Sequence, residues 1–168
     1  CPSCGLTLKE WYPALFEEDD PLQAVAQKVA EGTFDLGQLL LSLRDTGAMN
    51  SDFSKVDVKL GYHAPCHTKA QGIGLPWVDL LRDIPGVQIT DVDAGCCGMA
   101  GTYGFKKEKY QISMDIGKPL FKKMRDSHFD RAASECGMCQ TQIRHGAGIK
   151  TTHPVQVLAR AYGLHSEL

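Results

Sequence analysis

The amino-acid sequence predicts an α/β fold, with a parallel sheet of about four strands, helical crossovers and a helical segment in front. Two observations lead to this prediction. From Lys55 onward, short segments of alternating apolar residues are separated by segments with helical periodicity. Before Lys55, the apolar spacing is helical only. Alternation of strands and helices favours parallel strands joined by right-handed crossovers.

The helical part covers residues 1–44. Two stretches there repeat apolar residues at i, i+3, i+4 and i+7: Leu22, Val25, Ala26 and Val29, and then Leu36, Leu39, Leu40 and Leu43. Pro21 suits the first turn of a helix, and Gly32-Thr33 separates the stretches. The polar residues 45–54 follow, and we expect them to form a linker or long loop.

Four strands are expected in the remaining chain, each followed by a loop and most by a helix. The strands are predicted at 56–63, 87–92, 129–134 and 149–152, and the helices at 77–84, at 108–127 and from Pro154 onward. Pro119 lies inside the long helix and predicts a kink there.

Seven cysteines are the unusual feature of the composition. An odd number fits a disulfide framework poorly, and no secretion signal is present, so grouped cysteines indicate metal binding or redox chemistry. The groups are Cys1 and Cys4, then Cys66, then Cys96-Cys97, then Cys136 and Cys139.

The later groups each follow a predicted strand. Cys66 follows the first strand, Cys96-Cys97 the second, and Cys136 with Cys139 the third, whereas His153 follows the fourth. Loops after parallel strands meet at one edge of the sheet, where such folds bind ligands. The sequence therefore predicts one shared site, with the strands near 56–63, 87–93 and 129–134 adjacent and parallel.

The chemistry of that site has alternatives. Five thiolates exceed the four ligands of a zinc site and suit an iron–sulfur cluster, in which soft thiolates bind iron. Glycines near the cysteine pair allow close approach of the backbone: Gly95, Gly98, Gly101 and Gly104. A single C-x-x-C is also typical of zinc or of a redox dithiol, and an adjacent pair can form a strained disulfide.

The histidines have two interpretations. His63 and His67 bracket Cys66, and with His153 each suits either a metal or cluster contact or a place at a strand end or helix cap. For His128, His145 and His165 a place at a strand end or helix cap is preferred.

The arrangement Cys66, Cys96-Cys97-Gly98 and Cys136-x-x-Cys139 resembles the cysteine-rich CCG domain family, which includes one of the subunits of heterodisulfide reductase. The resemblance covers about residues 56–162. The stretches YHAPCH (62–67) and CCGMAGTYGFKK (96–107) are most similar to the branch of that family found in anaerobic glycerol-3-phosphate dehydrogenase.

An internal repeat supports a division of the chain. Cys1-x-x-Cys4-x-x-x-Leu8-Lys9 matches Cys136-x-x-Cys139-x-x-x-Ile143-Arg144. We therefore expect residues 1–54 to be the end of a preceding CCG repeat plus a helical linker, and residues 55–168 to be a complete CCG domain. Because the sequence starts with Cys1 and not Met, we also expect a fragment.

The resemblance implies a ligand set and a function. The metal ligands would be Cys66, Cys96, Cys97, Cys136 and Cys139, with Gly98 and His67 as further cofactor-binding residues and Cys1 and Cys4 as part of an incomplete second site. The cofactor would be a 4Fe-4S cluster, cubane or non-cubane, with zinc as the alternative. The chain would relay electrons from a flavin dehydrogenase subunit, which oxidises glycerol 3-phosphate, toward membrane quinone.

The same resemblance implies partners and a location. A ferredoxin-like region with C-x-x-C-x-x-C-x-x-x-C-P is absent from the sequence and is expected upstream of Cys1. The expected location is cytoplasmic, peripheral to the inner membrane through partner subunits. A cluster that reduces disulfides directly, and a zinc-stabilised interaction module, are the alternatives.

Composition excludes two other classes of protein. Eighteen basic and 20 acidic residues give a net charge of −2, which argues against a nucleic-acid partner. The longest apolar run is Leu39-Leu40-Leu41, far shorter than a membrane-spanning segment.

Overall fold

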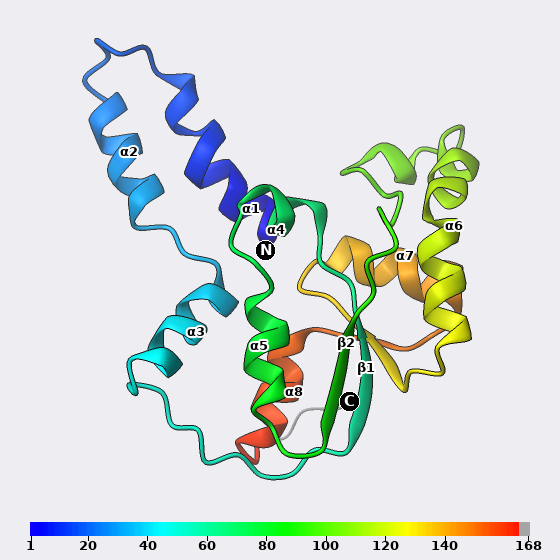
Figure 1. Ribbon diagram of the computed structural model, residues 1–168. Coiled ribbons are helices and arrows are strands. Elements are labelled where there is room, and N and C mark those ends of the chain that lie inside the picture. Colours follow the sequence, from blue (N-terminus) through cyan, green and yellow to red (C-terminus); the bar gives the residue numbers. More distant parts are fainter. Residues whose placement is uncertain (165–168) are drawn as a thin grey trace.

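The computed structural model, which describes residues 1–164, has four parallel strands in the order β2-β1-β3-β4 (Figure 1). Their bounds are Val58–Tyr62 for β1, Val87–Asp91 for β2, Arg131–Ala133 for β3 and Thr151–Thr152 for β4. The predicted α/β class, the number of strands and their parallel direction are confirmed. His165 lies outside the described residues.

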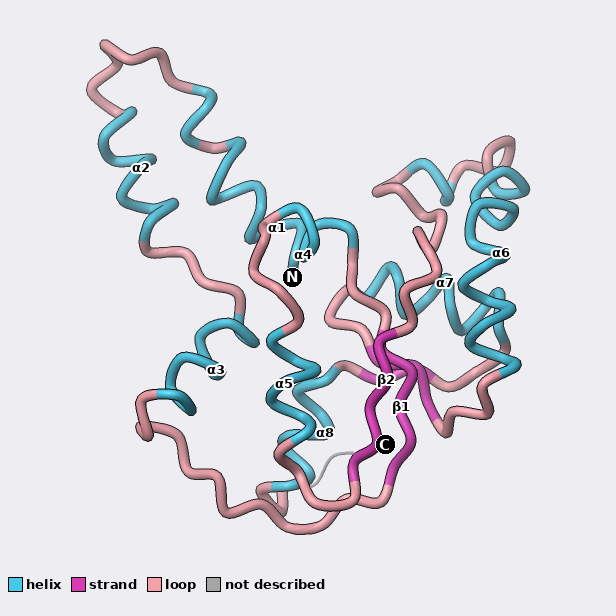
Figure 2. The backbone as a smooth tube through the Cα atoms, viewed as in Figure 1, coloured by secondary structure: helices cyan, strands magenta, loops and turns pink. Residues whose placement is uncertain are grey.

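Helices cover both faces of the sheet (Figure 2). Helices α5 (Pro76–Arg82) and α8 (Pro154–Ala161) enclose one apolar core, and α6 (Tyr110–Asp126) and α7 (Gly137–Ala147) enclose the other. Two further short helices lie in the connections: α4 (Cys66–Ala70) and the 3-10 turn η3 (Tyr103–Phe105).

Side chains of β1 alternate between the two cores, as a strand requires. Leu60 and Tyr62 are fully buried in the core beneath α5 and α8. Gly61 faces the other core, where an added Cβ would lie 2.5 Å from Phe129 Cδ2 and 2.9 Å from Met124 Sδ. Only glycine allows α6 and the segment before β3 to approach β1 this closely.

The strand ends differ slightly from the prediction. β3 begins at Arg131 and not at 129, because Asp130 forms hydrogen bonds to β1 through its side chain as well as its backbone. The Asp130 carboxylate accepts the Lys59 amide at 2.7 Å, while the Asp130 amide donates to the Lys59 carbonyl at 2.8 Å. Helix α6 continues through Pro119 to Asp126.

The N-terminal segment is helical, as predicted, and extends away from the sheet (Figure 1). It contains α1 (Pro2–Leu6), the π-helical turn η1 (Thr7–Trp11), the 3-10 turn η2 (Pro13–Leu15), α2 (Gln23–Glu31) and α3 (Leu36–Asp45). A long loop to β1 then covers residues 46–57, where 45–54 was expected.

The apolar stripes of α2 and α3 are largely exposed. Ala26 is buried, but Val25 and Leu36 keep 56% and 46% of their surface. Leu40, in contrast, packs against the core beside α5. The spacing therefore identified the helices correctly, but the two helices bury only part of their apolar faces in this chain.

Within residues 1–164, none of the helices combines the length and the apolar character needed to cross a lipid bilayer.

Candidate metal centre

The site is built at the carboxyl edge of the sheet. Cys66 begins α4 after β1, Cys96-Cys97 lies in the loop after β2, and Cys136 occupies the N-cap position of α7 after β3. Since β1 pairs with both β2 and β3 in parallel, these three connections emerge side by side. The predicted adjacency of the strands, and with it the convergence of the cysteines, is confirmed.

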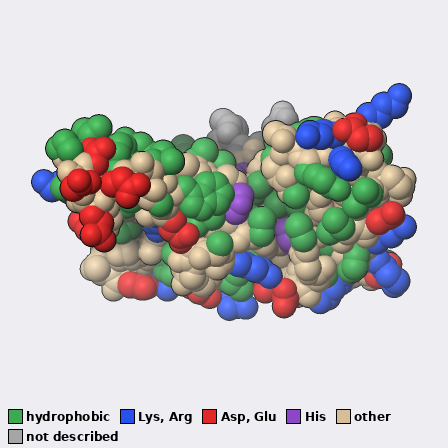
Figure 3. All heavy atoms as spheres, turned by 90° about the horizontal axis from the view of Figure 1, so that it is seen from above, with side chains coloured by type: hydrophobic (Ala, Val, Ile, Leu, Met, Phe, Trp, Pro, Cys, Tyr) green, Lys and Arg blue, Asp and Glu red, His purple; other side chains and the backbone are tan. Residues whose placement is uncertain are grey.

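One cleft of about 580 Å³ is lined by all of the cysteines predicted as ligands. These are Cys66, Cys96, Cys97, Cys136 and Cys139. A smaller adjoining cavity of about 230 Å³ is lined by four of them together with His63 and Lys69. From above, the molecule is hollowed between the N-terminal lobe and the lobe that carries α6 (Figure 3).

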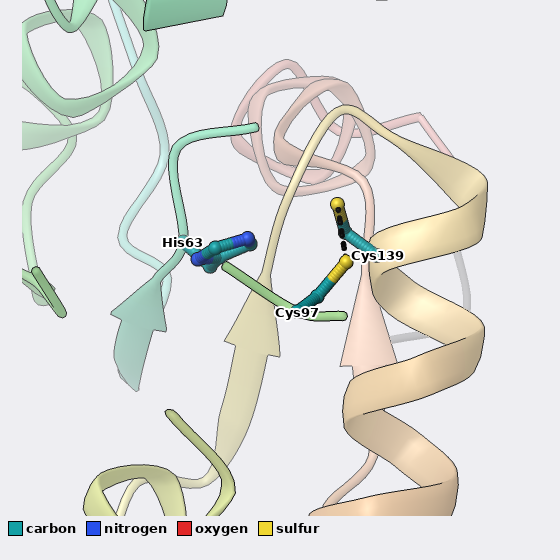
Figure 4. A group of neighbouring side chains, drawn as sticks. All are labelled: His63, Cys97 and Cys139. Atoms are coloured by element: carbon teal, nitrogen blue, oxygen red, sulfur yellow. Dashed lines mark hydrogen bonds between the residues drawn. The ribbon is translucent and has the colours of Figure 1, made fainter. Parts of the chain in front are cut away.

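Three side chains form the inner end of the site (Figure 4). The ligand atoms of His63, Cys97 and Cys139 all lie within 4.8 Å of one another, and all three residues are buried. The Sγ atoms of Cys97 and Cys139 are 3.3 Å apart. His63 extends β1 by one residue, with its amide bonded to the Ala133 carbonyl at 2.9 Å, so its ring is placed by the strand itself.

Hydrogen bonds and burial give the cysteines of the site different pKa values. A hydrogen bond from the Cys139 thiol lowers the pKa of Cys97 to about 4. The pKa of Cys139 itself is raised by its hydrogen bonds to Cys136 and Cys97. A hydrogen bond from Cys139 also lowers the pKa of Cys136 to about 6. Burial raises the pKa of Cys66. Two thiolates are therefore ready to bind metal at neutral pH.

Alkylation of the metal-free protein tests these pKa values. Thiolate, not thiol, reacts with iodoacetamide, so labelling of each cysteine rises as the pH passes its pKa. We expect labelling of Cys136 to be half-maximal near pH 6 and labelling of Cys66, whose pKa is raised by burial, to become half-maximal only at a clearly higher pH. Mass spectrometry of the labelled peptides from pH 5 to 10 measures both. Identical profiles for the two residues would contradict the geometry.

Gly98 holds the turn that follows the cysteine pair. Its amide donates to Cys96 Sγ at 3.3 Å, and its carbonyl accepts the Ser113 hydroxyl of α6 at 2.7 Å. Gln142 of α7 donates to that same hydroxyl at 2.9 Å. The loop is therefore tied to both helices of this layer, and a backbone amide already points at a candidate ligand sulfur, as it does around iron–sulfur clusters.

His67 lies at the outer wall of the cleft, away from the inner group. Its Nδ1 is 2.6 Å from the Ser3 hydroxyl, and its ring meets Trp11 edge to face at 6.0 Å. Ser3, Trp11 and Met138 line the cleft with it. Trp11 keeps 52% of its surface and forms part of the cleft wall. Unlike His67, these three residues were not marked by any local pattern in the sequence.

Two other histidines make contacts away from the cysteines. His153 caps α8 by accepting the Val155 amide at 3.0 Å, which agrees with the capping interpretation. His145 lies 3.1 Å from the Tyr110 hydroxyl. Neither residue is among those lining the two cavities.

Cys1 and Cys4 do not line the two cavities, although Ser3 between them does. Cys1 occupies the N-cap of α1, as Cys136 does for α7. The matching C-x-x-C motifs therefore begin their helices in the same way, but only the second pair lines the cleft together with other cysteines.

Comparison with known families agrees with this geometry. The cysteine-rich domain family named CCG matches residues 60–144, which contain every cysteine of the cleft. The chain belongs to this CCG family. The match runs from within β1 into α7 and leaves the N-terminal helices, β4 and α8 outside it.

Relatives of this CCG chain are named as subunits of redox complexes. One subunit of the anaerobic glycerol-3-phosphate dehydrogenase of Escherichia coli (strain K12) is 34% identical over 95% of this chain and 38% of its own length. One subunit of the fumarate reductase (CoM/CoB) of Methanothermobacter marburgensis is 29% identical over 96% of the chain and 31% of its own length. The chain thus spans about a third of the length of each.

A third relative is named by its cofactor. An uncharacterized iron–sulfur protein of Methanocaldococcus jannaschii is 27% identical over 86% of this chain and 25% of its own length. No solved structure matches the chain.

The residues present fit an iron–sulfur cluster. Five thiols line one cleft, two of them have a lowered pKa, and the Gly98 amide already donates to a cysteine sulfur. Thiolate is the ligand that soft iron prefers, and more than four thiolates at one edge exceed what a zinc site uses.

Proposed function

We propose that this chain holds one iron–sulfur cluster in the cleft and serves as an electron-transfer subunit, or part of one, in an oxidoreductase complex. The ligands would be Cys66, Cys96, Cys97, Cys136 and Cys139. The observation that carries the proposal is the meeting of these thiols, from three separate connections, in one cleft. When bound, a four-iron cluster, cubane or non-cubane, would accept an electron and pass it on.

The chain's own residues would set the properties of the cluster. Hydrogen bonds from backbone amides to ligand sulfurs, such as the one from Gly98, stabilise the negative charge of a reduced cluster. Met99, Met138 and Trp11 would limit the access of water from the cleft wall. The contribution of the protein is therefore to position the cluster and to tune its reduction potential.

The partner and location proposals rest on the similarity to the glycerol-3-phosphate dehydrogenase relative. In a complex of that kind, a flavin subunit would oxidise the substrate and this chain would relay electrons toward membrane quinone. It would lie in the cytoplasm, peripheral to the inner membrane through its partner subunits. A ferredoxin-like region would supply further clusters. Cys1 and Cys4 would belong to a second site that this chain holds only in part.

Elemental analysis tests the central proposal. After anaerobic purification, we expect about four irons and a similar amount of sulfide per chain, the content of a single four-iron cluster. Visible absorption that bleaches on reduction would accompany them. Stoichiometric zinc without iron or sulfide would contradict the proposal.

One observation favours zinc as the second candidate. His63, Cys97 and Cys139 already lie within 4.8 Å, and one imidazole with two thiolates is a common part of a zinc site. Cys136, which is hydrogen-bonded to Cys139, would be the fourth ligand. In this case the metal would stabilise the fold and carry no electrons.

Direct reduction of disulfides at the cluster is the other alternative, favoured by the open cleft. A disulfide reductase consumes a disulfide with an artificial electron donor alone. An electron relay reduces quinone analogues only when the flavin subunit and its substrate are present. The two activities can be measured on the same loaded protein.

A further inference from the structure

A buried carboxylate beside the site has no cation among the described residues. Glu135 keeps only 5% of its surface, and it occupies the position between β3 and Cys136. The ion pairs within residues 1–164 do not include it. Burial of a carboxyl group is costly unless hydrogen bonds replace water.

Two hydroxyl groups supply those hydrogen bonds. Tyr62 donates to the carboxylate, with its Oη 2.9 Å from Oε2 and 3.0 Å from Oε1, and Thr68 Oγ1 donates to Oε1 at 2.6 Å. Both partners are completely buried. The group is therefore dry and compact, and each of its members is held in one place.

The three residues of this hydrogen-bond network lie next to two of the cysteine-bearing connections. Tyr62 is the last residue of β1, Thr68 lies two residues after Cys66 in α4, and Glu135 directly precedes Cys136. The network therefore joins the connection that carries Cys66 to the connection that carries Cys136.

Helix α4 depends on such a link. It has only five residues, and no side chain caps its N-terminus at Pro65. The hydroxyl of Thr68 makes a buried hydrogen bond to Glu135. The contact of His67 with Ser3 is only part-buried, and the ion pair of Lys69 with Asp93 is exposed. A surface ion pair contributes little to fixing the position of a helix.

We propose that Glu135 is a positioning residue, which through Thr68 and Tyr62 holds Cys66 at the distance from Cys136 that one shared cofactor requires. This proposal rests on the proposed function for the identity of the cofactor, but the link between the two segments exists without it.

The link is tested first on the metal-free protein. Thr68→Val removes the hydroxyl and keeps the branched shape, and Thr68→Ser restores the hydroxyl. We expect faster amide hydrogen exchange in 66–70 and in 134–139 for the valine variant, and exchange close to wild type for the serine variant. Thr152→Val is the matched control, since it removes another buried hydroxyl, bonded to Gln156 at 3.0 Å.

The metal-loaded protein supplies the functional readout. Residues that hold a ligand in place change metal affinity by about 10–100-fold. We therefore expect Thr68→Val and Glu135→Gln each to accelerate metal release to a chelator at least about tenfold, and the double variant to be no faster than the faster single one. The reduction potential of a bound cluster should also shift in Thr68→Val and return in Thr68→Ser.

Two results would overturn the inference. One is unchanged exchange of both segments in Thr68→Val. The other is metal release and potential equal to those of wild type, with no more loss of thermal stability than Thr152→Val shows. If the purified protein holds zinc and no iron, the iron–sulfur proposal fails, but hydrogen exchange in 66–70 and 134–139 still decides whether Glu135 links the two segments, since that measurement needs no cofactor.

Discussion

Replacing Cys96 or Cys97 with serine is expected to remove the cluster. A serine hydroxyl is a hard and weakly acidic ligand, so it binds soft iron poorly. Cys97 also belongs to the buried inner group, 3.3 Å from Cys139. Because even residues that merely support a ligand change metal affinity by about 10–100-fold, we expect iron per chain to fall at least about tenfold in either variant. Iron and sulfide analysis, with the visible spectrum, measures the loss.

The matched control is the double change Cys1→Ser and Cys4→Ser. Both residues are exposed and lie outside the two cavities, so iron content and absorption should stay close to those of the wild type. If the double variant loses iron as completely as Cys96→Ser, Cys1 and Cys4 belong to the same site, and the proposed division of the chain is wrong.

Replacing Gly98 with alanine is expected to disrupt the loop that carries the cysteine pair. Gly98 has φ +87°, and an added Cβ would lie 2.0 Å from the Ser113 carbonyl oxygen. That oxygen belongs to the backbone of α6 and cannot move without displacing the helix. Overlap and left-handed strain together should lower the free energy of unfolding by more than about 4 kcal/mol. Urea unfolding of the metal-free variant measures this loss, and cluster content should fall with it.

Gly95→Ala is the control that separates strain from overlap. Gly95 has nearly the same backbone angle, φ +82°, but a Cβ there would meet no atom within 4 Å. We expect it to cost only about 1–2 kcal/mol, the strain of a left-handed residue. Equal losses for the two variants would show that packing against Ser113 does not hold the loop.

Local patterns in the sequence were sufficient to predict which segments form strands and helices and which cysteines follow the strands. A strand that alternates, such as Val58–Tyr62, shows its period of two directly, and the period of α6 is equally clear. Once the strands are parallel, the cysteines after them must share one edge, because all carboxyl ends of a parallel sheet lie together. The convergence of Cys66, Cys96 and Cys136 therefore follows from periodicity and position alone.

Distances across the site were decided only by the tertiary structure. The sequence offered His63 and His67 on either side of Cys66, and the family resemblance implied His67 as the cofactor-binding one. The sheet instead places His63 against Cys97 and Cys139, while α4 turns His67 outward to Ser3 and Trp11. Nor did the sequence indicate that Glu135 would meet Tyr62 and Thr68, which lie about 70 positions away. Periodicity describes how a residue is placed within its own element. The contacts between elements depend on strand order and helix packing, which bring together residues that have no pattern in common.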